Sequence, residues 1–373
     1  MKRLWIWFLL AGAVWALLFA FVPGTRQELV FYGNENDRFC DYWIPRECAA
    51  SVTTYRPDTV PRLDACYPPF GYVIAGVFPR DKWIGGLLFD ISALVLLMGA
   101  VFCCAKGTKW NRVGWAVASS MLGQTLLALG VANQILLAAA GVCMFFAWHA
   151  KDDWRRLVAL VALSVAVALK ISPALFSLLL VRDRRWRDLS VVAVCSLVLG
   201  VVPFCWHGGI VGMLDLLENL RLHSDFYTVV DGWGFIAIGR SAYLAVGRGM
   251  DAFRADYLPY RMGNVLLALA LIYPFFVGKF GRWRVSSDAL LLALVVTLLP
   301  GCQHGYTALY FLPAVLCLPQ DRLTVGHFLF FALFCPVQVL HGGFTVNHLV
   351  AALSAMLLCI PQIKLAPRQR CNT

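Results

Sequence analysis

The sequence predicts an all-α, polytopic integral membrane protein with about twelve transmembrane helices. Of its 373 residues, 60% are hydrophobic and only 14% are charged, whereas soluble proteins are roughly half apolar and about a quarter charged. The mean hydropathy is +0.70, and the basic residues stand in short clusters between apolar runs. A chain with so few charges cannot cover a water-soluble surface, which excludes a soluble enzyme, a secreted domain and a disordered scaffold.

Apolar runs between polar or basic segments define the helices, and most are about as long as the crossing of a hydrocarbon core requires. The first run, residues 4–22, follows Lys2 and Arg3, and no small-residue cleavage site closes it, so we interpret it as a transmembrane helix and not as a signal peptide. The apolar runs after it cover residues 83–104, 113–130, 134–150, 157–181, 189–206, 262–278, 289–300, 307–318, 323–340 and 345–363.

Residues 157–181 are long enough for one tilted helix, but Lys170 and Pro173 interrupt the run. A proline breaks the hydrogen-bond ladder of a helix. A single crossing would place one of two basic clusters, residues 151–156 or 182–187, outside the cell. Two short half-spans that meet near Lys170 leave both clusters in the cytoplasm. We prefer this second interpretation, which gives twelve crossings.

The distribution of charge then orients the chain. With both termini in the cytoplasm, including the tail 364–373, the cytoplasmic segments hold 19 of the 32 basic residues. Two long outer loops, residues 23–82 and 207–261, hold 14 of the 21 acidic residues. This asymmetry follows the positive-inside rule, so the net charge of +11 reflects membrane topology and not a nucleic-acid partner.

Neither outer loop is long enough for a soluble domain with its own core, so we treat residues 1–373 as one transmembrane domain. Within the loops, residues 70–78 and 232–249 are moderately apolar, and we expect short helices there that lie along the membrane surface.

The first outer loop places acidic side chains among aromatic ones. Asp41 stands beside Tyr42 and Trp43, with Asp37 and Glu47 nearby. An acid that is partly shielded from water at a membrane surface suits a general base acting on a hydroxyl group. The alternative is a solvated acidic loop that the neighbouring arginines balance.

Two further polar residues fall at the outer side under this topology. Lys170 is the one Lys or Arg inside the membrane, where such residues are costly and usually functional; it can pair with a lipid phosphate or extend to the headgroups. His304 lies in the turn between two short spans, where it can bind phosphate, exchange a proton or be structural. A transporter would carry such residues near the midplane of the membrane, so their outer position counts against one.

Taken in order, short segments of the chain resemble glycosyltransferase family 87 of the GT-C superfamily, over roughly residues 1–320. The segments are Cys40-Asp41-Tyr42-Trp43, Tyr67-Pro68-Pro69, Ala168-Leu169-Lys170-Ile171-Ser172-Pro173, and His304-Gly305-Tyr306 followed by Leu312-Pro313. The stretch Val131-Ala132-Asn133-Gln134 is loosely similar to a turn of that family. Two features depart from the family pattern: Gly305 separates His304 from Tyr306, and Pro300-Gly301 replaces a Ser-Pro pair.

The resemblance implies a GT-C-like fold and a glycosyltransferase that faces the outside of the plasma membrane. Its donor would be a sugar on a polyprenyl phosphate, mannose first and arabinofuranose second, and its acceptor a hydroxyl of a glycolipid or envelope glycan. Transfer would invert the anomeric carbon. The resemblance implies that Asp41, as general base, and His304 are catalytic and that Lys170 binds the phosphate of the donor. It also implies that substrate is bound by Tyr42, Tyr67 and Tyr306; Asp37 and Glu47 are secondary candidates for the site.

No cofactor is expected, because a phosphate leaving group does not require one. The thirteen cysteines form no Cys-x-x-Cys pair that would indicate a metal site, although the sequence leaves a divalent metal open. The expected partners are the lipid-linked sugar, the acceptor and the bilayer, with no nucleic acid. The alternative function is a flippase for lipid-linked sugars or another polytopic transporter.

Overall fold

The computed structural model describes residues 5, 6, 9, 10, 13, 14, 38–49, 55, 66–231, 234–277, 284–300, 305–317, 338–339 and 344–345. This part of the chain is helical apart from one antiparallel ladder, in which β1 (Gln338–Val339) pairs with β2 (Phe344–Thr345). Most of the first predicted span, most of the last two spans and the tail 364–373 lie outside the described residues.

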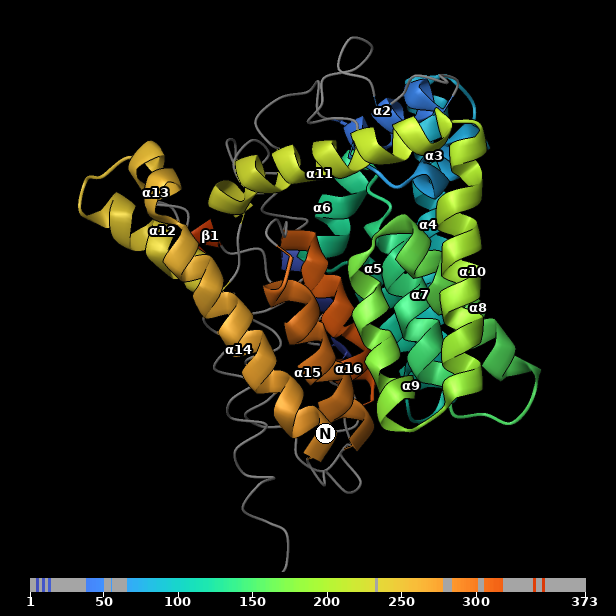
Figure 1. The fold of residues 1–373 in the computed structure, drawn as a ribbon. Helices are drawn as coiled ribbons and strands as arrows, with labels where there is room; N and C mark the ends of the chain where they lie inside the picture. Colours follow the sequence, from blue (N-terminus) through green and yellow to red (C-terminus); the bar gives the residue numbers. More distant parts are fainter. Residues whose placement is uncertain are drawn as a thin grey trace, which may run out of the picture.

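The first part of the chain forms two short helices and a group of upright ones (Figure 1). In order they are α2 (Cys40–Cys48), α3 (Pro69–Gly76), α4 (Lys82–Cys104), α5 (Lys109–Ser120), α6 (Gly123–Val131), α7 (Ile135–Trp148) and α8 (Trp154–Leu169).

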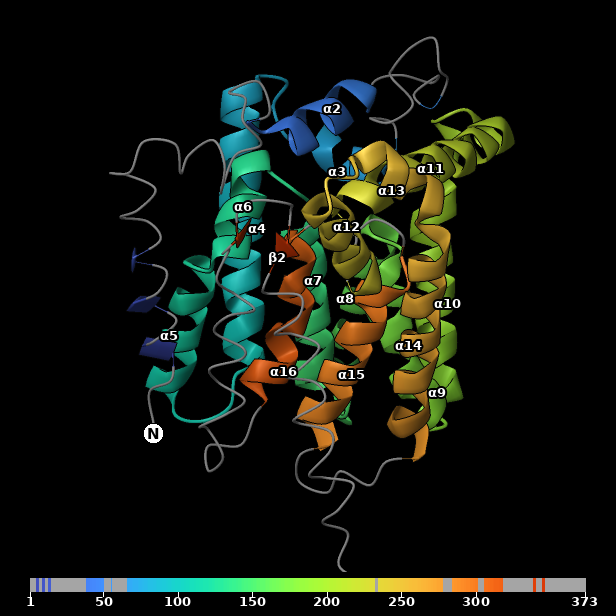
Figure 2. The same ribbon diagram turned by 90° about the vertical axis from the view of Figure 1, so that its left-hand side faces the viewer.

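The second part continues with η3 (Ser172–Ser177), α9 (Leu178–Arg182), α10 (Trp186–Val201), η4 (Val202–Cys205), α11 (Gly209–Asp231), α12 (Phe235–Ala245), α13 (Met250–Asp256), α14 (Leu258–Val277), α15 (Arg284–Leu298), η6 (Gly305–Phe311) and α16 (Leu312–Leu316). Figure 2 shows α4, α7, α8 and α10 roughly upright, with α2, α3 and α11 at one end of them.

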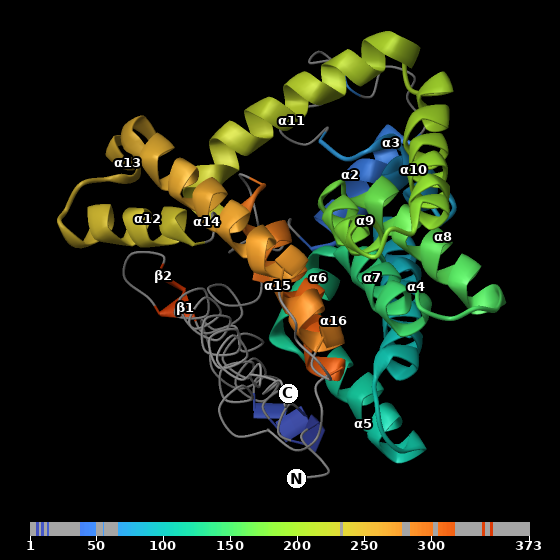
Figure 3. The same cartoon turned by 60° about the horizontal axis from the view of Figure 1, so that its bottom comes forward.

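Helix α7 forms the centre of the core. Its sequence is apolar on every side, and most of its residues are buried, as expected for a helix without a polar face. It packs between α4 and α8, and α10 packs against the far side of α8. Figure 3 shows α15 and α16 between α14 and this group, where α16 contacts both α4 and α7.

Three described helices are long and apolar enough to cross a membrane: Lys82–Cys104, Leu258–Val277, and α10 extended through η4 as Trp186–Cys205. They leave large apolar side chains such as Leu96, Leu197 and Leu266 exposed. Apolar side chains on the outside of a helical bundle are typical of contact with lipid. The structure therefore supports a helical membrane protein, and the number of twelve crossings stays a prediction.

The predicted span 113–130 consists of two helices and not of one straight helix, and its crossing of the membrane stays a prediction. Helices α5 and α6 meet at an angle of 51° after Ser120. The Thr125 hydroxyl donates a hydrogen bond of 2.7 Å to the carbonyl of Ser119, which lies next to the break. A side-chain donor thus satisfies a backbone group that the bend releases from the helical ladder.

The reversal predicted at Lys170 is present. Helix α8 ends at Leu169, Lys170 has extended backbone angles, and the chain turns back through η3 and α9. The two basic clusters that flank this hairpin lie together: Arg156 is 3.7 Å from Asp188, and Arg185 donates to the carbonyl of His149. Both clusters therefore lie at the same end of the bundle, as the two-half-span interpretation requires.

The second outer loop contains the short helix expected within residues 232–249, which is α12, and also a long helix that was not expected. Helix α11 has 23 residues and runs across the end of the bundle in Figure 1. Leu216 and Asn219 are buried on it, and Asn219 donates to the carbonyl of Tyr55 at 3.1 Å. Its charged residues interrupt the apolar run, so the segment reads as a loop in the sequence although it is helical. In the first loop, the expected helix near 70–78 is α3.

Candidate active site

The position of Asp41 depends on how α2 begins. The preceding residue, Phe39, has a left-handed backbone (φ 59°), which is unfavourable for a non-glycine residue. Its N–H donates to the carbonyl of Gly130 at 3.1 Å, and its ring is buried against Trp83 and Gly86. These contacts offset the strain and anchor the first turn of α2, which carries Asp41, to the end of α6.

The turn between α6 and α7 is equally well defined. Ala132 has a left-handed backbone (φ 54°) and ends α6, and the N–H of Asn133 donates to the carbonyl of Ala128 at 2.8 Å. The Asn133 side-chain oxygen accepts a hydrogen bond of 2.8 Å from the N–H of Ile135. This local bond between an Asn side chain and the backbone two residues on is a common turn motif. It directs the amide nitrogen of Asn133 toward the outer loop.

That nitrogen lies among three residues that are far apart in the sequence. Asn133 Nδ2 is 2.5 Å from Asp41 Oδ2 and 3.0 Å from the hydroxyl of Tyr306, and it is 3.5 Å from the hydroxyl of Tyr67. Asn133, Tyr67 and Tyr306 are all buried, whereas Asp41 is half-buried. The site is therefore a polar cluster inside an otherwise apolar end of the bundle.

Tyr67 is held in place from both of its ends. Its carbonyl accepts a hydrogen bond of 2.9 Å from the hydroxyl of Tyr55, and Pro68 and Pro69 then lead directly into α3. Its hydroxyl bonds to Asp41, and its pKa is raised well above 10.0, first by burial and then by the negative charge of Asp41. A phenol in this state stays protonated and acts as a hydrogen-bond donor toward the carboxylate.

Lys170 reaches the same cluster from the end of α8. Its ammonium nitrogen lies 4.6 Å from the centroid of the Tyr67 ring, a distance typical of a cation–π contact. A lysine directly after the last residue of a helix also complements the negative end of the helix dipole. The hydroxyl of Tyr67 thus contacts Asp41 while its ring contacts Lys170, so an acid and a cation both contact one side chain.

Comparison with known proteins identifies the family. The model of glycosyltransferase family 87 matches residues 65–300, which is more than half of the chain. The chain belongs to glycosyltransferase family 87. No curated protein and no solved structure matches it.

Membership of family 87 makes the protein a membrane glycosyltransferase, with a sugar donor, an acceptor and the lipid bilayer as partners, and does not favour a transporter. The matched range contains Tyr67, Asn133 and Lys170, but it begins after Asp41 and ends before Tyr306. The tertiary structure places these last two residues on the family 87 region, through hydrogen bonds with Asn133.

The other predicted site residues are placed differently. Tyr42 is buried between Phe78 and Phe89 and donates to the carbonyl of Pro79, so it joins α2 to the start of α4. Glu47 is exposed near the end of α2. Asp37 and His304 lie outside the described residues. The cluster therefore contains Asp41, Tyr67, Lys170 and Tyr306 of the predicted set.

Sequence reasoning assigned no role to Asn133, which is at the centre of this cluster. The available signal was a pair of amide side chains, Asn133 and Gln134, between two apolar runs. Gln134 donates to the carbonyl of Gly71 at 3.0 Å, and a Cβ at Gly71 would lie 2.5 Å from the Gln134 side-chain oxygen. This pair therefore positions both short outer helices, α2 and α3.

Among the described residues, no group of three or more His, Cys, Asp and Glu side chains is arranged to hold a metal ion. The polar atoms of the family 87 site are instead one carboxylate, one amide, two phenols and one ammonium group.

Proposed function

We propose that this family 87 enzyme transfers a sugar from a polyprenyl-phosphate donor to a hydroxyl group of a glycolipid or envelope glycan, with inversion. Mannose is the first choice of sugar and arabinofuranose the second. The observation that carries the proposal is the arrangement around Tyr67, which contacts Asp41 through its hydroxyl and Lys170 through its ring. A displacement at an anomeric carbon needs a base at the attacking hydroxyl and a cation at the leaving phosphate, and this arrangement brings one of each to the same tyrosine.

In the proposed reaction, the acceptor oxygen forms a bond to the anomeric carbon as the bond from that carbon to the phosphate oxygen breaks. The electron pair of the broken bond leaves with the polyprenyl phosphate. The proton of the acceptor hydroxyl passes to Asp41, which acts as general base. Because a single displacement occurs from the side opposite the leaving group, the configuration of the sugar inverts.

Lys170 stabilises the charge that develops on the departing phosphate. A fixed cation is most effective where water is scarce, and the Tyr67 ring beside Lys170 belongs to a buried side chain. His304 assists at the phosphate, and Tyr67 and Tyr306 contact the sugar or the acceptor. Tyr42 supports the site by holding α2 on α4. The leaving group is a stable phosphate, so the reaction as written needs no cofactor.

We place the site at the outer face of the plasma membrane. Asp41 lies on α2 at the top of Figure 1, whereas α9, which leads into the basic cluster 182–187, lies at the bottom. Basic clusters mark the cytoplasmic side. A cysteine introduced at Asp58 should react with an impermeant maleimide in intact cells, and one at Arg184 should react only after lysis. The reverse pattern would overturn this orientation.

The catalytic test uses the purified protein in detergent with radiolabelled mannosyl-phosphoryl polyprenol and a lipid extract of the native envelope. The variant Asp41→Asn keeps the size of the side chain but removes the base, so kcat should fall by about 10²- to 10⁴-fold with little change in the KM for the donor. The matched control is Asp152→Asn, because the Asp152 side chain is 99% exposed and lies in the opposite, basic cluster.

Persistent transfer by Asp41→Asn would disprove the base assignment. If the wild-type enzyme transfers neither mannose nor arabinofuranose but moves the lipid-linked sugar across a vesicle membrane, the flippase alternative is favoured and the proposal fails.

A further inference from the structure

The nitrogen and the oxygen of the Asn133 side chain both have hydrogen-bond partners in the described structure. Its nitrogen carries two hydrogens, and the two short contacts, to Asp41 Oδ2 at 2.5 Å and to the Tyr306 hydroxyl at 3.0 Å, account for both. Its oxygen accepts from the backbone N–H of Ile135. If the amide were flipped, its oxygen would face the Asp41 carboxylate and its nitrogen would face the N–H of Ile135, and neither pair could form a hydrogen bond. The contacts therefore determine the orientation of the amide.

Burial makes these contacts hard to replace. Asn133 has no exposed surface, so water cannot take over its hydrogen bonds when they are lost. The turn that carries it is itself anchored, by the bond from the Asn133 N–H to Ala128 and by the left-handed Ala132. The same turn supplies the Gly130 carbonyl that holds Phe39, two residues before Asp41. Asp41 is therefore connected to this turn in two ways: through the backbone hydrogen bond of Phe39 to Gly130, and through its own carboxylate, which accepts from Asn133.

We infer that Asn133 is a positioning residue of the transfer reaction: it joins Asp41 to Tyr306 and sets the orientation of the Asp41 carboxylate, to which the Tyr67 hydroxyl also bonds. The inference rests on the proposed role of Asp41 as base. A neutral amide is suited to this task, because it donates to the carboxylate without adding a charge. A carboxylate at position 133 would instead place a second negative charge beside Asp41 and could not donate to it.

The test compares Asn133→Ala, Asn133→Asp and the control Gln134→Ala. Asparagine and aspartate have the same shape, so Asn133→Asp can still accept from Ile135 and fold. Gln134→Ala removes the neighbouring amide and its bond to Gly71 without touching Asp41. The readouts are kcat and the KM for the donor, measured separately, and the free energy of unfolding, for each single variant and for the double variant Asp41→Asn with Asn133→Ala.

We expect Asn133→Ala to lower kcat on the order of 10²-fold, as a misplaced catalytic group does. The KM for the donor should change little, because Asn133 acts on the proposed base and not on the donor. The double variant Asp41→Asn with Asn133→Ala should lose no more kcat than Asp41→Asn alone, because Asn133 acts through Asp41. In unfolding, the losses of the two single variants should add to more than the loss of the double variant, since the same hydrogen bond is lost in each. Asn133→Asp should lower kcat like Asn133→Ala, because a carboxylate cannot donate to Asp41, and Gln134→Ala should lower the free energy of unfolding with a smaller loss of kcat.

Additive effects of Asp41→Asn and Asn133→Ala on both kcat and the free energy of unfolding would overturn the inference, and so would activity of Asn133→Ala equal to that of the wild type. The coupling in unfolding does not depend on catalysis. If Asp41→Asn remains active while this coupling is present, the proposed base is wrong but the contact between Asn133 and Asp41 stands.

Discussion

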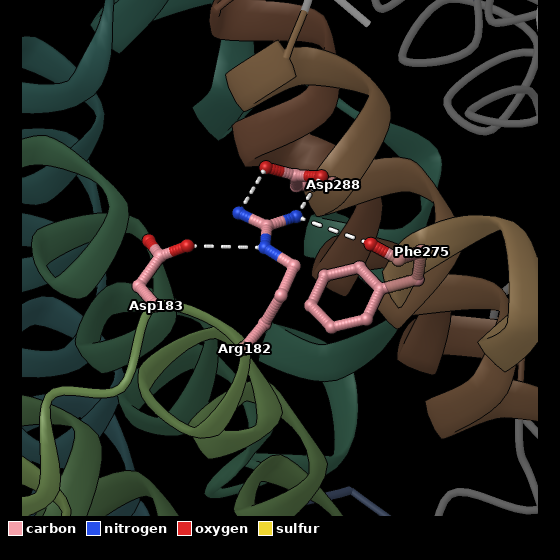
Figure 4. A network of polar contacts seen from close by, with 4 residues as sticks. All are labelled: Arg182, Asp183, Phe275 and Asp288. Carbon is pink, nitrogen blue, oxygen red and sulfur yellow. Dashed lines mark hydrogen bonds and ion pairs between the residues drawn. The ribbon is translucent and has the colours of Figure 1, made fainter. Parts of the chain in front are cut away.

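Arg182 connects three helices at the end of the bundle opposite Asp41, and its removal should destabilise the protein strongly. Arg182, the last residue of α9, donates two hydrogen bonds to the carboxylate of Asp288 on α15, at 2.5 and 2.9 Å (Figure 4). It also lies 3.1 Å from Asp183 and packs 4.6 Å from the centroid of the Phe275 ring on α14. One side chain thus joins α9, α14 and α15.

The expected magnitude follows from burial. The Arg182 and Asp288 side chains are 9% and 3% exposed, and breaking a buried pair by removing one partner costs about 3–5 kcal/mol, because the other charge is left uncompensated. Arg182→Ala should therefore lower the free energy of unfolding by about this amount. The double variant Arg182→Met with Asp288→Leu leaves no buried charge, so it should be more stable than Arg182→Ala.

The assay is equilibrium unfolding of the purified protein in mixed micelles with increasing sodium dodecyl sulfate, followed by tryptophan fluorescence. The control is Arg155→Ala, because the Arg155 side chain is 46% exposed and its contact with Asp153 is at the surface. A loss for Arg182→Ala below about 1 kcal/mol, the contribution of an exposed pair, would show that Arg182 and Asp288 do not act as a buried ion pair. A double variant less stable than Arg182→Ala would show this as well.

Three further predictions address the site and the packing around it. Lys170→Met should lower kcat/KM for the lipid donor by about 10²-fold and Lys170→Arg by much less. Equal losses in the two variants would contradict a role for the positive charge of Lys170. For Tyr67, the folded-state pKa lies above the unfolded value of 10.0, so the unfolded chain releases this proton first and stability falls as pH rises past about 10. Tyr67→Phe should weaken this fall when unfolding is measured between about pH 9 and 11, and an identical slope would contradict the buried phenol. Because the sulfur atoms of Cys104 and Cys317 are 3.9 Å apart, copper phenanthroline should join α4 to α16 by a disulfide between them, detected by non-reducing peptide mapping and absent from Cys317→Ala; cross-links between other cysteines alone would contradict this packing.

Particular elements show how far sequence reasoning extends. The reversal at Lys170 could be predicted because Pro173 interrupts the apolar run and the basic clusters on both sides of the run must lie in the cytoplasm. The bend at Ser120 could not, because an apolar run of the right length looks the same whether it is straight or broken. Helix α11 was also missed, since its charged residues interrupt the apolar pattern that marks a span, and its burial depends on contacts with Tyr55, more than 150 residues earlier.

The sequence alone determined the class of protein and the identity of most polar candidates. These properties depend on composition, on the length of apolar runs and on the placement of charges, all of which are local in the chain. The tertiary structure decided which candidates meet. Asp41 and Tyr306 lie at opposite ends of the chain, and they are joined by a buried amide whose importance depends on contacts between residues distant in sequence. Tyr42 looks as suited to a site as Tyr67, but the rotation from one helical position to the next turns it into the packing between α2 and α4.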